Sequence, residues 1–484
     1  MSRGLFAVKA ISAGEGEDQQ LIRTLSLPAL TAFGIGSIIG TGIFVLTGTA
    51  AANHAGPALV LSFLLAGCAG AFAALCYAEL ASMIPVAGSA YSYAYATLGE
   101  LVAWFIGWNL VLEYTFSVAT VAVGWSAYVV SLLAQFGIHL PAALIDAPID
   151  RGPGDVGLIA TGALLNLPAV FIVAAVAFVC YIGIRESSAL NSAIVVLKVC
   201  VVLGFVLLGA GFVTTANWHP FVPANSGQFG HFGWSGVLAA AGIIFFAFIG
   251  FDTVSTCAQE ARNPRRDVPL GIIASLAICS VLYVATALVL TGMVPYTQLD
   301  VAAPVALAID RHPELRWLGL PVKLGAIAAM ISVMLVMTVG QARIFMAMAA
   351  DGLLPAWFAV VHPRFRTPAR STLVTWVAAT VIGGVLPVRI LGELVSIGTL
   401  LAFATVCIGV LVLRRLRPDL PRRFRVPAPW FTCVAGALVC FGLMAALPPD
   451  TWVRLAVWTV FGLVIYAFYG YRNSRLRVAS QARV

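Results

Sequence analysis

The chain has 484 residues, of which 61% are hydrophobic and only 10% are charged. Soluble domains average about 45–50% apolar and about 25% charged residues, so this composition excludes an ordinary soluble domain and indicates an integral membrane protein. The net charge of +8 does not indicate a nucleic-acid partner, because the basic residues lie in loops on alternate sides of the apolar runs.

Cysteine and histidine lack the spacing of a metal site or of a disulfide framework. The nine cysteines lie in or beside apolar runs without a CxxC pair, and the six histidines form no HExxH-like motif. We therefore expect no metal and no cofactor. We also do not expect an enzyme, because no cluster of nucleophile, base or ligand residues gathers near one bilayer face. The N-terminal segment lacks the short apolar core and cleavage site of a signal peptide.

Taken in chain order, twelve apolar runs predict membrane-spanning helices, each of which needs about 20 apolar residues to cross a bilayer. The runs cover 27–52, 57–84, 99–133, 165–184, 192–214, 236–257, 270–294, 324–346, 371–387, 390–413, 430–447 and 452–471. The ninth run is short. A further apolar stretch at 156–164 precedes the fourth run and is open to assignment as part of it.

The first run has an unusual centre, Phe-Gly-Ile-Gly-Ser-Ile-Ile-Gly-Thr-Gly-Ile-Phe at 33–44. Glycine at this density weakens a helix, and backbone groups freed within a membrane persist only beside protein or a water-filled cavity. We predict a break there and interpret it as the binding site. A GxxxG packing motif accounts for Gly36 and Gly40 but not for Ser37, Thr41 and Gly42 around them. The spacing and the missing strand exclude a dinucleotide-binding loop.

The sixth run contains a second predicted break, Gly-Ile-Ile-Phe-Phe-Ala-Phe-Ile-Gly-Phe-Asp at 242–252. Runs one and six are five apart, which predicts two five-helix halves of opposite topology. Interrupted segments at corresponding positions of two halves indicate a transporter's binding site. The predicted organisation is a cytoplasmic N-terminal tail at 1–26, a first repeat at 27–214, a second inverted repeat at 236–413, helices 11 and 12 at 430–471, and a cytoplasmic C-terminal tail at 472–484.

The basic residues predict the orientation. With the N-terminus inside, 20 of the 28 lie in cytoplasmic segments and six lie outside, while Lys198 and Arg343 fall within spans. This bias predicts that both termini are cytoplasmic in a multi-pass protein of the cell (inner) membrane.

Ionisable residues within spans are costly and invite a functional interpretation. Glu113 in the third span is either a structural carboxylate paired with a neighbouring helix or a site residue. Asp252 follows the second break and either titrates there or caps the next half-helix. Lys198 in the fifth span either snorkels to the surface or exchanges a proton, since burial disfavours the charged ammonium.

Five stretches occur in an order that resembles one transporter family. They are 34–44 (Gly-Ile-Gly-Ser-Ile-Ile-Gly-Thr-Gly-Ile-Phe), Pro-Val-Ala-Gly-Ser-Ala-Tyr-Ser-Tyr beginning at Pro85, 248–252 (Phe-Ile-Gly-Phe-Asp), 260–269 (Glu-Ala-Arg-Asn-Pro-Arg-Arg-Asp-Val-Pro), and 340–345 (Gly-Gln-Ala-Arg-Ile-Phe) leading to 351–355 (Asp-Gly-Leu-Leu-Pro). Together they resemble the amino acid–polyamine–organocation superfamily, and within it the bacterial relatives of the cationic amino acid transporters.

This resemblance implies an all-α polytopic membrane protein of the leucine-transporter-type fold, with 12 transmembrane helices in two inverted five-helix repeats plus two, and alternating access. It implies that the substrate carboxylate meets the amides of Gly40, Thr41 and Gly42, and that the amine meets carbonyls at both breaks. The expected substrate contacts are Ile38, Gly40, Thr41, Gly42, Glu113, Phe246, Ala247, Phe248, Ile249, Phe251 and Met330. The expected proton-coupling residues are Lys198 and Asp252.

We expect a secondary active, proton-coupled symporter of small neutral L-amino acids, with Met330 shortening the pocket. Uptake of cationic amino acids, favoured if Glu113 is unpaired, and exchange of amino acids or amines remain alternatives. A non-transporting amino acid sensor is the alternative from another class. The expected partners are an amino acid, a proton and the lipid bilayer, with no nucleic acid; a small membrane subunit is left open.

Overall fold

The computed structural model describes residues 8–9, 25–83, 88–152, 157–183, 188–257 and 260–477. Arg185, the start of the motif at Pro85, most of the predicted tail at 1–26 and the last part of the tail at 472–484 lie outside the described residues. Within the described residues the chain is mostly helical, with a single two-stranded hairpin.

The elements of the first half are α1 (Leu27–Ile38), α2 (Thr47–Ala50), α3 (Leu59–Met83), α4 (Ser89–Thr97), α5 (Glu100–Gln135), β1 (Ile149–Arg151), β2 (Leu158–Ala160), α6 (Leu167–Ile182) and α7 (Ser188–Gly209). Those of the second half are α8 (Gly233–Ile244), α9 (Thr253–Thr256), α10 (Pro264–Met293), α11 (Pro304–Asp310), α12 (Arg316–Ala350), α13 (Ala369–Val385), α14 (Val388–Leu416), α15 (Pro429–Ala445), α16 (Pro449–Ile465) and α17 (Tyr471–Asn473).

Every predicted apolar run contains a helix, so the sequence located the helical segments correctly. By length and composition, eight helical segments of the described chain can cross a membrane, and α1, α6, α13 and α15 are shorter apolar helices. The chain is therefore a polytopic membrane protein. One alternative is excluded: the apolar stretch before the fourth run forms β2, which pairs with β1 in antiparallel register instead of extending α6.

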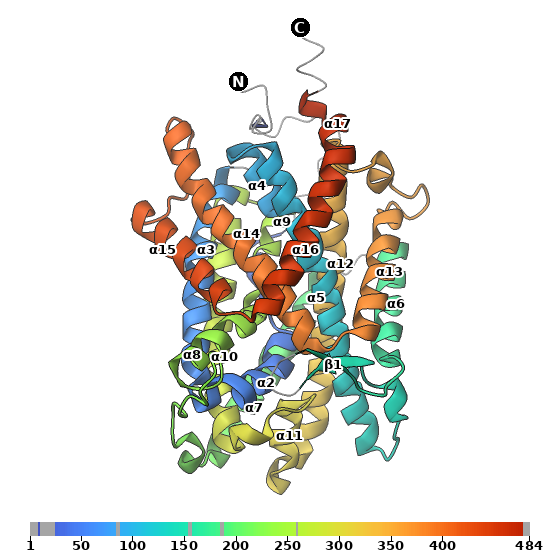
Figure 1. The fold of residues 1–484 in the computed structure, drawn as a ribbon, viewed down its shortest axis with the longest axis vertical. Coiled ribbons are helices and arrows are strands. Elements are labelled where there is room, and N and C mark those ends of the chain that lie inside the picture. Colours follow the sequence, from blue (N-terminus) through green and yellow to red (C-terminus); the bar gives the residue numbers. More distant parts are fainter. Residues whose placement is uncertain are drawn as a thin grey trace.

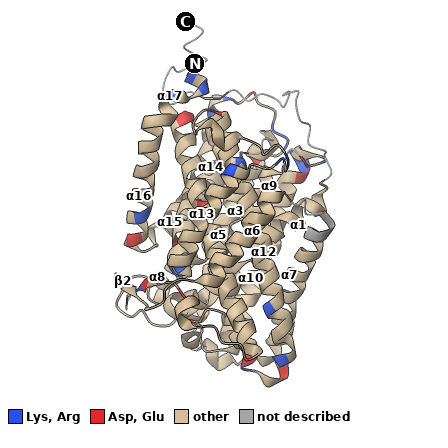
Figure 2. Cartoon of the chain, turned by 90° about the vertical axis from the view of Figure 1, so that its right-hand side faces the viewer, with Lys and Arg blue, Asp and Glu red and all other residues tan. Residues whose placement is uncertain are grey.

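The long helices run side by side along the molecule's long axis (Figure 1). α5 packs against both α12 and α14, and α10 packs against α3 and α1, whereas α6 and α13 pack together at one side. Lys, Arg, Asp and Glu are sparse along most of the bundle's length, and many of them lie near its ends (Figure 2). This distribution suits a bundle whose middle is surrounded by hydrocarbon.

Asp351, which follows α12, gathers segments from both ends of the chain. Its carboxylate accepts from the Nζ of Lys9 at 2.6 Å and from the hydroxyl of Tyr91 at 2.8 Å. Its carbonyl accepts from the backbone amide of Arg475 at 3.1 Å. Lys9 and Arg475, which lie close to the two termini, therefore meet at the same end of the bundle. This arrangement agrees with the prediction that both termini lie on one side of the membrane.

Candidate functional site

The first predicted break is confirmed as an interruption between α1 and the helical segment that follows it. α1 ends at Ile38, and Ile39 adopts an extended conformation with φ −74° and ψ 105°. The helix resumes at Thr41, and a wide turn of π type covers Gly42–Leu46. The amides that open a helix have no intrahelical acceptor and carry the positive end of its dipole. Thr41 and Gly42 therefore present donor groups at the break.

The second predicted break is also confirmed. α8 ends at Ile244, a tight helical turn covers Phe245–Phe248, and Ile249 is extended with ψ 138°. Gly250 follows with φ +119°, a backbone conformation that side-chain-bearing residues rarely adopt. A Cβ on Gly250 would also lie 2.7 Å from the carbonyl oxygen of Ser37, so this position requires glycine for two reasons.

The two breaks contact each other directly. A Cβ added to Gly42 would overlap the backbone of Ala247, so the absence of a side chain at Gly42 lets the two chain segments approach. The hydroxyl of Thr253 lies 3.0 Å from that of Ser37 and donates to the carbonyl of Gly250 at 2.5 Å. Four half-helix ends, from opposite halves of the sequence, are therefore brought together.

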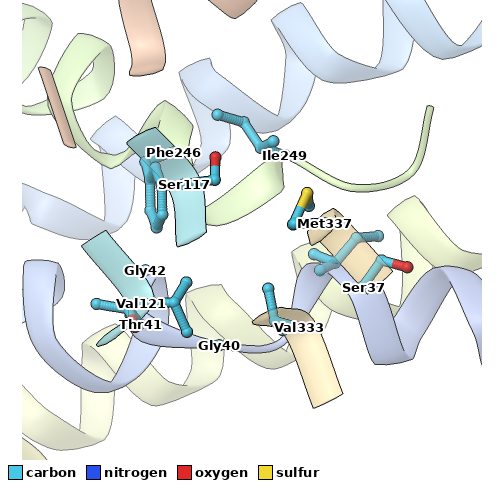
Figure 3. Close-up of a pocket in the computed structure, with 11 residues that line it drawn as sticks. Ser37, Gly40, Thr41, Gly42, Ser117, Val121, Phe246, Ile249, Val333 and Met337 are labelled. Atoms are coloured by element: carbon cyan, nitrogen blue, oxygen red, sulfur yellow. The ribbon is translucent and has the colours of Figure 1, made fainter. Parts of the chain in front are cut away.

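A cavity lies where the breaks meet (Figure 3). Its volume is about 10 Å³, enough for about one water molecule. The described conformation is therefore closed, and an amino acid requires the walls to separate. Residues from both breaks, from α5 and from α12 line it: Ser37, Ile38, Gly40, Thr41, Gly42, Ser117, Val121, Phe246, Ile249, Val333 and Met337.

Six of the substrate contacts expected from the sequence line this cavity: Ile38, Gly40, Thr41, Gly42, Phe246 and Ile249. Glu113, Ala247, Phe248, Phe251 and Met330 do not line it in this conformation. Ser37, Ser117, Val121, Val333 and Met337 were not anticipated. A helical pattern would have found most of them, since residues four and eight positions after Glu113 and three and seven after Met330 share a helix face.

Two of the aromatic residues expected to contact the substrate serve packing here. Phe248 meets the rings of Phe63 and Tyr283 with centroids 6.2 and 5.4 Å away. Phe251 packs 4.9 Å from the ring of Phe403. Edge-on and tilted ring contacts of this kind stabilise a core. Of the three expected aromatic contacts, Phe246, Phe248 and Phe251, only Phe246 lines the cavity.

Lys198 is completely buried, which excludes the snorkelling interpretation. Its Nζ donates to the carbonyl of Gly36 at 2.6 Å and to the hydroxyl of Ser332 at 3.3 Å. Gly36 lies in the last turn of α1, where unsatisfied carbonyls carry the negative end of the helix dipole and favour a cation. The ammonium thus joins α7 and α12 to the end of α1, immediately before the break.

Tyr283 of α10 also holds the first break. Its hydroxyl donates at 2.9 Å to the carbonyl of Ile38, one of the break carbonyls that the family resemblance assigns to the substrate amine. A carbonyl oxygen has two lone pairs, so this bond leaves room for a second donor. On the other side of the break, Tyr128 of α5 donates to the carbonyl of Phe44 at 2.9 Å.

The two buried carboxylates of the region lie beside the cavity. Glu113 is 1% exposed, and neither of its carboxylate oxygens has a hydrogen-bond partner among the described residues. Asp252 is also 1% exposed and accepts from the hydroxyl of Tyr114 at 3.1 Å through one oxygen. Asp252 occupies the cap position of α9, but its side chain makes no capping bond. Its side chain therefore does not cap α9 in this conformation and serves instead as an acceptor for Tyr114.

Comparison with known proteins gives one consistent family. The amino acid permease family model matches residues 25–468. The chain is 45% identical to a methylthioribose transporter of Bacillus subtilis over 98% of this chain and 99% of that protein. It is 45% identical to the branched-chain amino acid permease BcaP of Bacillus subtilis, over 98% of this chain and all of that protein. It is 40% identical to cationic amino acid transporter 4 of Homo sapiens, over 82% of this chain and 60% of that protein.

Proposed function

The chain belongs to the amino acid permease family, and from that premise we propose that it is a secondary active transporter that binds an amino acid between its two broken helices. The observation that carries the proposal is the meeting of both breaks at one cavity lined by Gly40, Thr41, Gly42, Phe246 and Ile249. Free helix amides and carbonyls placed at one point match the carboxylate and ammonium that all amino acids share.

For the architecture, we infer that twelve helices cross the membrane in the leucine-transporter-type arrangement. Two inverted five-helix repeats at 27–214 and 236–413 precede helices 11 and 12 at 430–471. The five-helix separation of the two breaks supports the repeats. The bias of basic residues supports a cell membrane location with both termini cytoplasmic, as does the meeting of both chain ends at Asp351.

In the bound state, the substrate carboxylate takes hydrogen bonds from the amides of Gly40, Thr41 and Gly42. The ammonium group donates to carbonyls at the second break, with Ala247 and Ile249 best suited. The carbonyl of Phe246 already accepts from the amide of Ile249 at 3.2 Å, so, like the carbonyl of Ile38, it keeps one lone pair for the ammonium. Because these contacts use only backbone atoms, they define amino acids as a class rather than one side chain.

Small neutral amino acids are the substrates that the side-chain wall favours. Ser117, Val121, Val333 and Met337 form this wall, and no charged side chain of the described residues lines the cavity. A guanidinium placed there without a partner carries a large desolvation cost. Aliphatic substrates also agree with the branched-chain specificity named for the 45% identical BcaP.

Cationic substrates are the second candidate, and one observation favours them. Glu113 lies one helical turn from Ser117 and has no hydrogen-bond partner among the described residues. A modest opening between α5 and the second break would bring this carboxylate to the side chain of a basic substrate. Met330, two turns from Met337 on the same face of α12, then limits the length of that side chain.

Proton coupling is assigned to Lys198, with Asp252 as a second titrating group. A transported proton biases the two access states only through different affinity for each state. The bond from Lys198 to the end of α1 supplies such a difference, because a neutral amine loses its favourable interaction with the helix dipole. Loss of the proton therefore weakens the link between α7 and the broken helix.

A binding screen on purified protein tests the substrate class. We expect alanine, serine, valine and leucine to raise the melting temperature more than arginine or lysine does. The B. subtilis relative makes methylthioribose a necessary competitor in the screen. Stabilisation by methylthioribose alone would contradict an amino acid site. Binding of neutral amino acids without uptake into proteoliposomes would instead indicate a sensor.

A further inference from the structure

A second cavity lies far from the broken helices, between α6 and α13. It has a volume of about 390 Å³ and is lined almost entirely by apolar groups. We call it the α6–α13 crevice, and its lining residues are Ala174, Ala177, Phe178, Tyr181, Thr372, Leu373 and Trp376. These two helices pack together at one side of the bundle (Figure 1), and the side chains of Phe178 and Leu373 are 64% and 48% exposed. The crevice therefore opens toward the surrounding lipid.

A basic loop closes one end of this crevice. The ring of Tyr181 lies 5.7 Å from that of His362 and 5.8 Å from that of Phe365. The hydroxyl of Thr367 donates to the carbonyl of Tyr181 at 2.7 Å. The loop 362–368 is thus fixed to the end of α6, and it leads directly into α13 and the lining residue Thr372.

This loop carries Arg364 and Arg366, the first turn of α13 carries Arg370, and all three are exposed. The sequence has no acidic residue between Asp351 and Glu393. Within the described part of the chain, no carboxylate forms an ion pair with any of the three arginines. Three guanidinium groups without a carboxylate partner among the described residues, beside an apolar crevice, favour a ligand that combines an anionic head with a hydrocarbon tail.

Trp376, which lines the crevice, carries a buried donor without an acceptor among the described residues. The indole Nε1 of Trp376 is inaccessible and has no hydrogen-bond partner among the described residues. Arg370 and Trp376 are six residues apart on α13, about 9 Å along the helix axis. A phosphate at Arg370 would therefore place an ester carbonyl of the same lipid at about the depth of Trp376 along α13.

We propose that the α6–α13 crevice binds an anionic phospholipid of the cytoplasmic leaflet, with an acyl chain against Ala177 and Phe178 and the phosphate at Arg364, Arg366 and Arg370. The cytoplasmic leaflet is chosen because the proposed orientation places these three arginines on the cytoplasmic side of the membrane. The site itself does not depend on which amino acid is transported. Basic pockets between transmembrane helices recognise lipid head groups through the same combination of charge and hydrocarbon contact.

The experiment uses full-length protein purified in detergent, with dioleoyl phosphatidylglycerol and dioleoyl phosphatidylcholine as probes. Native mass spectrometry measures the retained lipid, and thermal unfolding measures the stabilisation. We expect wild type to retain phosphatidylglycerol preferentially. The triple variant R364Q/R366Q/R370Q should lose about fivefold in affinity for each arginine removed. The matched control R417Q/R423Q/R425Q removes equal charge from another basic loop and should retain wild-type affinity.

A second variant tests the hydrocarbon part independently of charge. Ala177→Phe fills the crevice and should reduce phosphatidylglycerol retention while all three arginines remain. Equal retention of both lipids by wild type would overturn the proposal. Equal losses in the two triple variants would overturn it as well, because the attraction would then be general rather than local. Unchanged retention of phosphatidylglycerol by Ala177→Phe would show that the crevice does not bind the acyl chain.

Discussion

In α1, the carbonyls next to the break are held by other helices: Lys198 of α7 donates to Gly36 and Tyr283 of α10 donates to Ile38. At the second break, the carbonyls of Phe246 and Gly250 are held from within the same segment. Other helices reach only its flanks, where Ser396 of α14 donates to the carbonyl of Ile243 and Tyr114 of α5 donates to Asp252. The amide of Ile249 donates to the carbonyl of Phe246, and the hydroxyl of Thr253 donates to that of Gly250. The carbonyls at the first gap are therefore held by side chains of other helices, whereas those at the second gap are held by their own segment.

This difference assigns different tasks to the two breaks. A segment held by side chains of two other helices changes its position when those helices move or when one of the donors loses a proton. A segment held by its own turn keeps its shape and moves as a unit. We infer that coupling enters through the first break and that the second provides a fixed partner surface for the substrate. The following variants separate these tasks, from the largest expected effect to the smallest.

Gly250→Ala should have the largest effect, because it breaks the self-supporting segment itself. Alanine is strained at φ +119°, and its Cβ would lie 2.7 Å from the carbonyl oxygen of Ser37. We expect amino acid uptake to fall by roughly 100-fold and substrate-induced stabilisation to disappear. The control is Gly204→Ala, where an added Cβ meets open space. Comparable uptake by the two variants would show that the contact at Gly250 is not required.

Lys198→Met should abolish coupling while leaving binding largely intact. Methionine preserves the volume but removes the ammonium that holds Gly36 and Ser332. We expect no accumulation driven by a pH gradient, with exchange of internal for external substrate retained. Lys323→Met is the matched control. Lys323 is only 3% exposed, and its Nζ forms an ion pair of 3.1 Å with Asp310, which lies in α11 and not at either break. Gradient-driven accumulation by Lys198→Met would show that Lys198 is not required for proton coupling.

Tyr283→Phe should have an intermediate effect, because it removes one donor from the first break and leaves the other. The lost bond to Ile38 is worth about 1 kcal/mol, so uptake should fall by about fivefold. Tyr128→Phe is the comparison, since its bond to Phe44 lies beyond the break. A larger loss of uptake in Tyr128→Phe than in Tyr283→Phe would show that transport depends more on the bond to Phe44 than on the bond at the break.

Thr253→Val should have the smallest effect. It removes the hydroxyl contacts with Ser37 and with the carbonyl of Gly250, but the glycine conformation and the bond to Phe246 persist. We expect uptake to fall by about twofold. Thr291→Val removes an equally buried hydroxyl in α10 and should leave uptake unchanged. A tenfold loss in Thr253→Val would contradict the view that the second break supports itself.

The sequence predicted the helices and both breaks because their causes are local. Apolar runs and glycine clusters act on the residues that carry them, so Gly40 and Gly250 marked the interruptions correctly. The sequence did not predict the partner of Lys198, because its bond to Gly36 joins residues 162 positions apart. The short apolar segment of β2 resembled a helix extension because hydropathy alone does not distinguish a strand from a helix over a few residues.

The side-chain wall shows a second limit. Met330 was expected in the pocket, but Met337, seven residues later, lines the cavity. Both positions share one face of α12, and helical periodicity identifies a face without its depth in the membrane. Glu113 and Ser117 on α5 differ in the same way. Depth depends on how the broken helices pack against α5 and α12, which only the tertiary structure supplies.

Accumulation of a neutral amino acid in proteoliposomes under an imposed pH gradient tests the central claim most directly. With an alkaline interior and no internal substrate, wild-type protein should raise internal valine above the external concentration, and a protonophore should abolish the excess. The same vesicles with Lys198→Met should only equilibrate or exchange. Uptake that ignores the gradient and requires substrate inside would contradict proton symport and establish an exchanger.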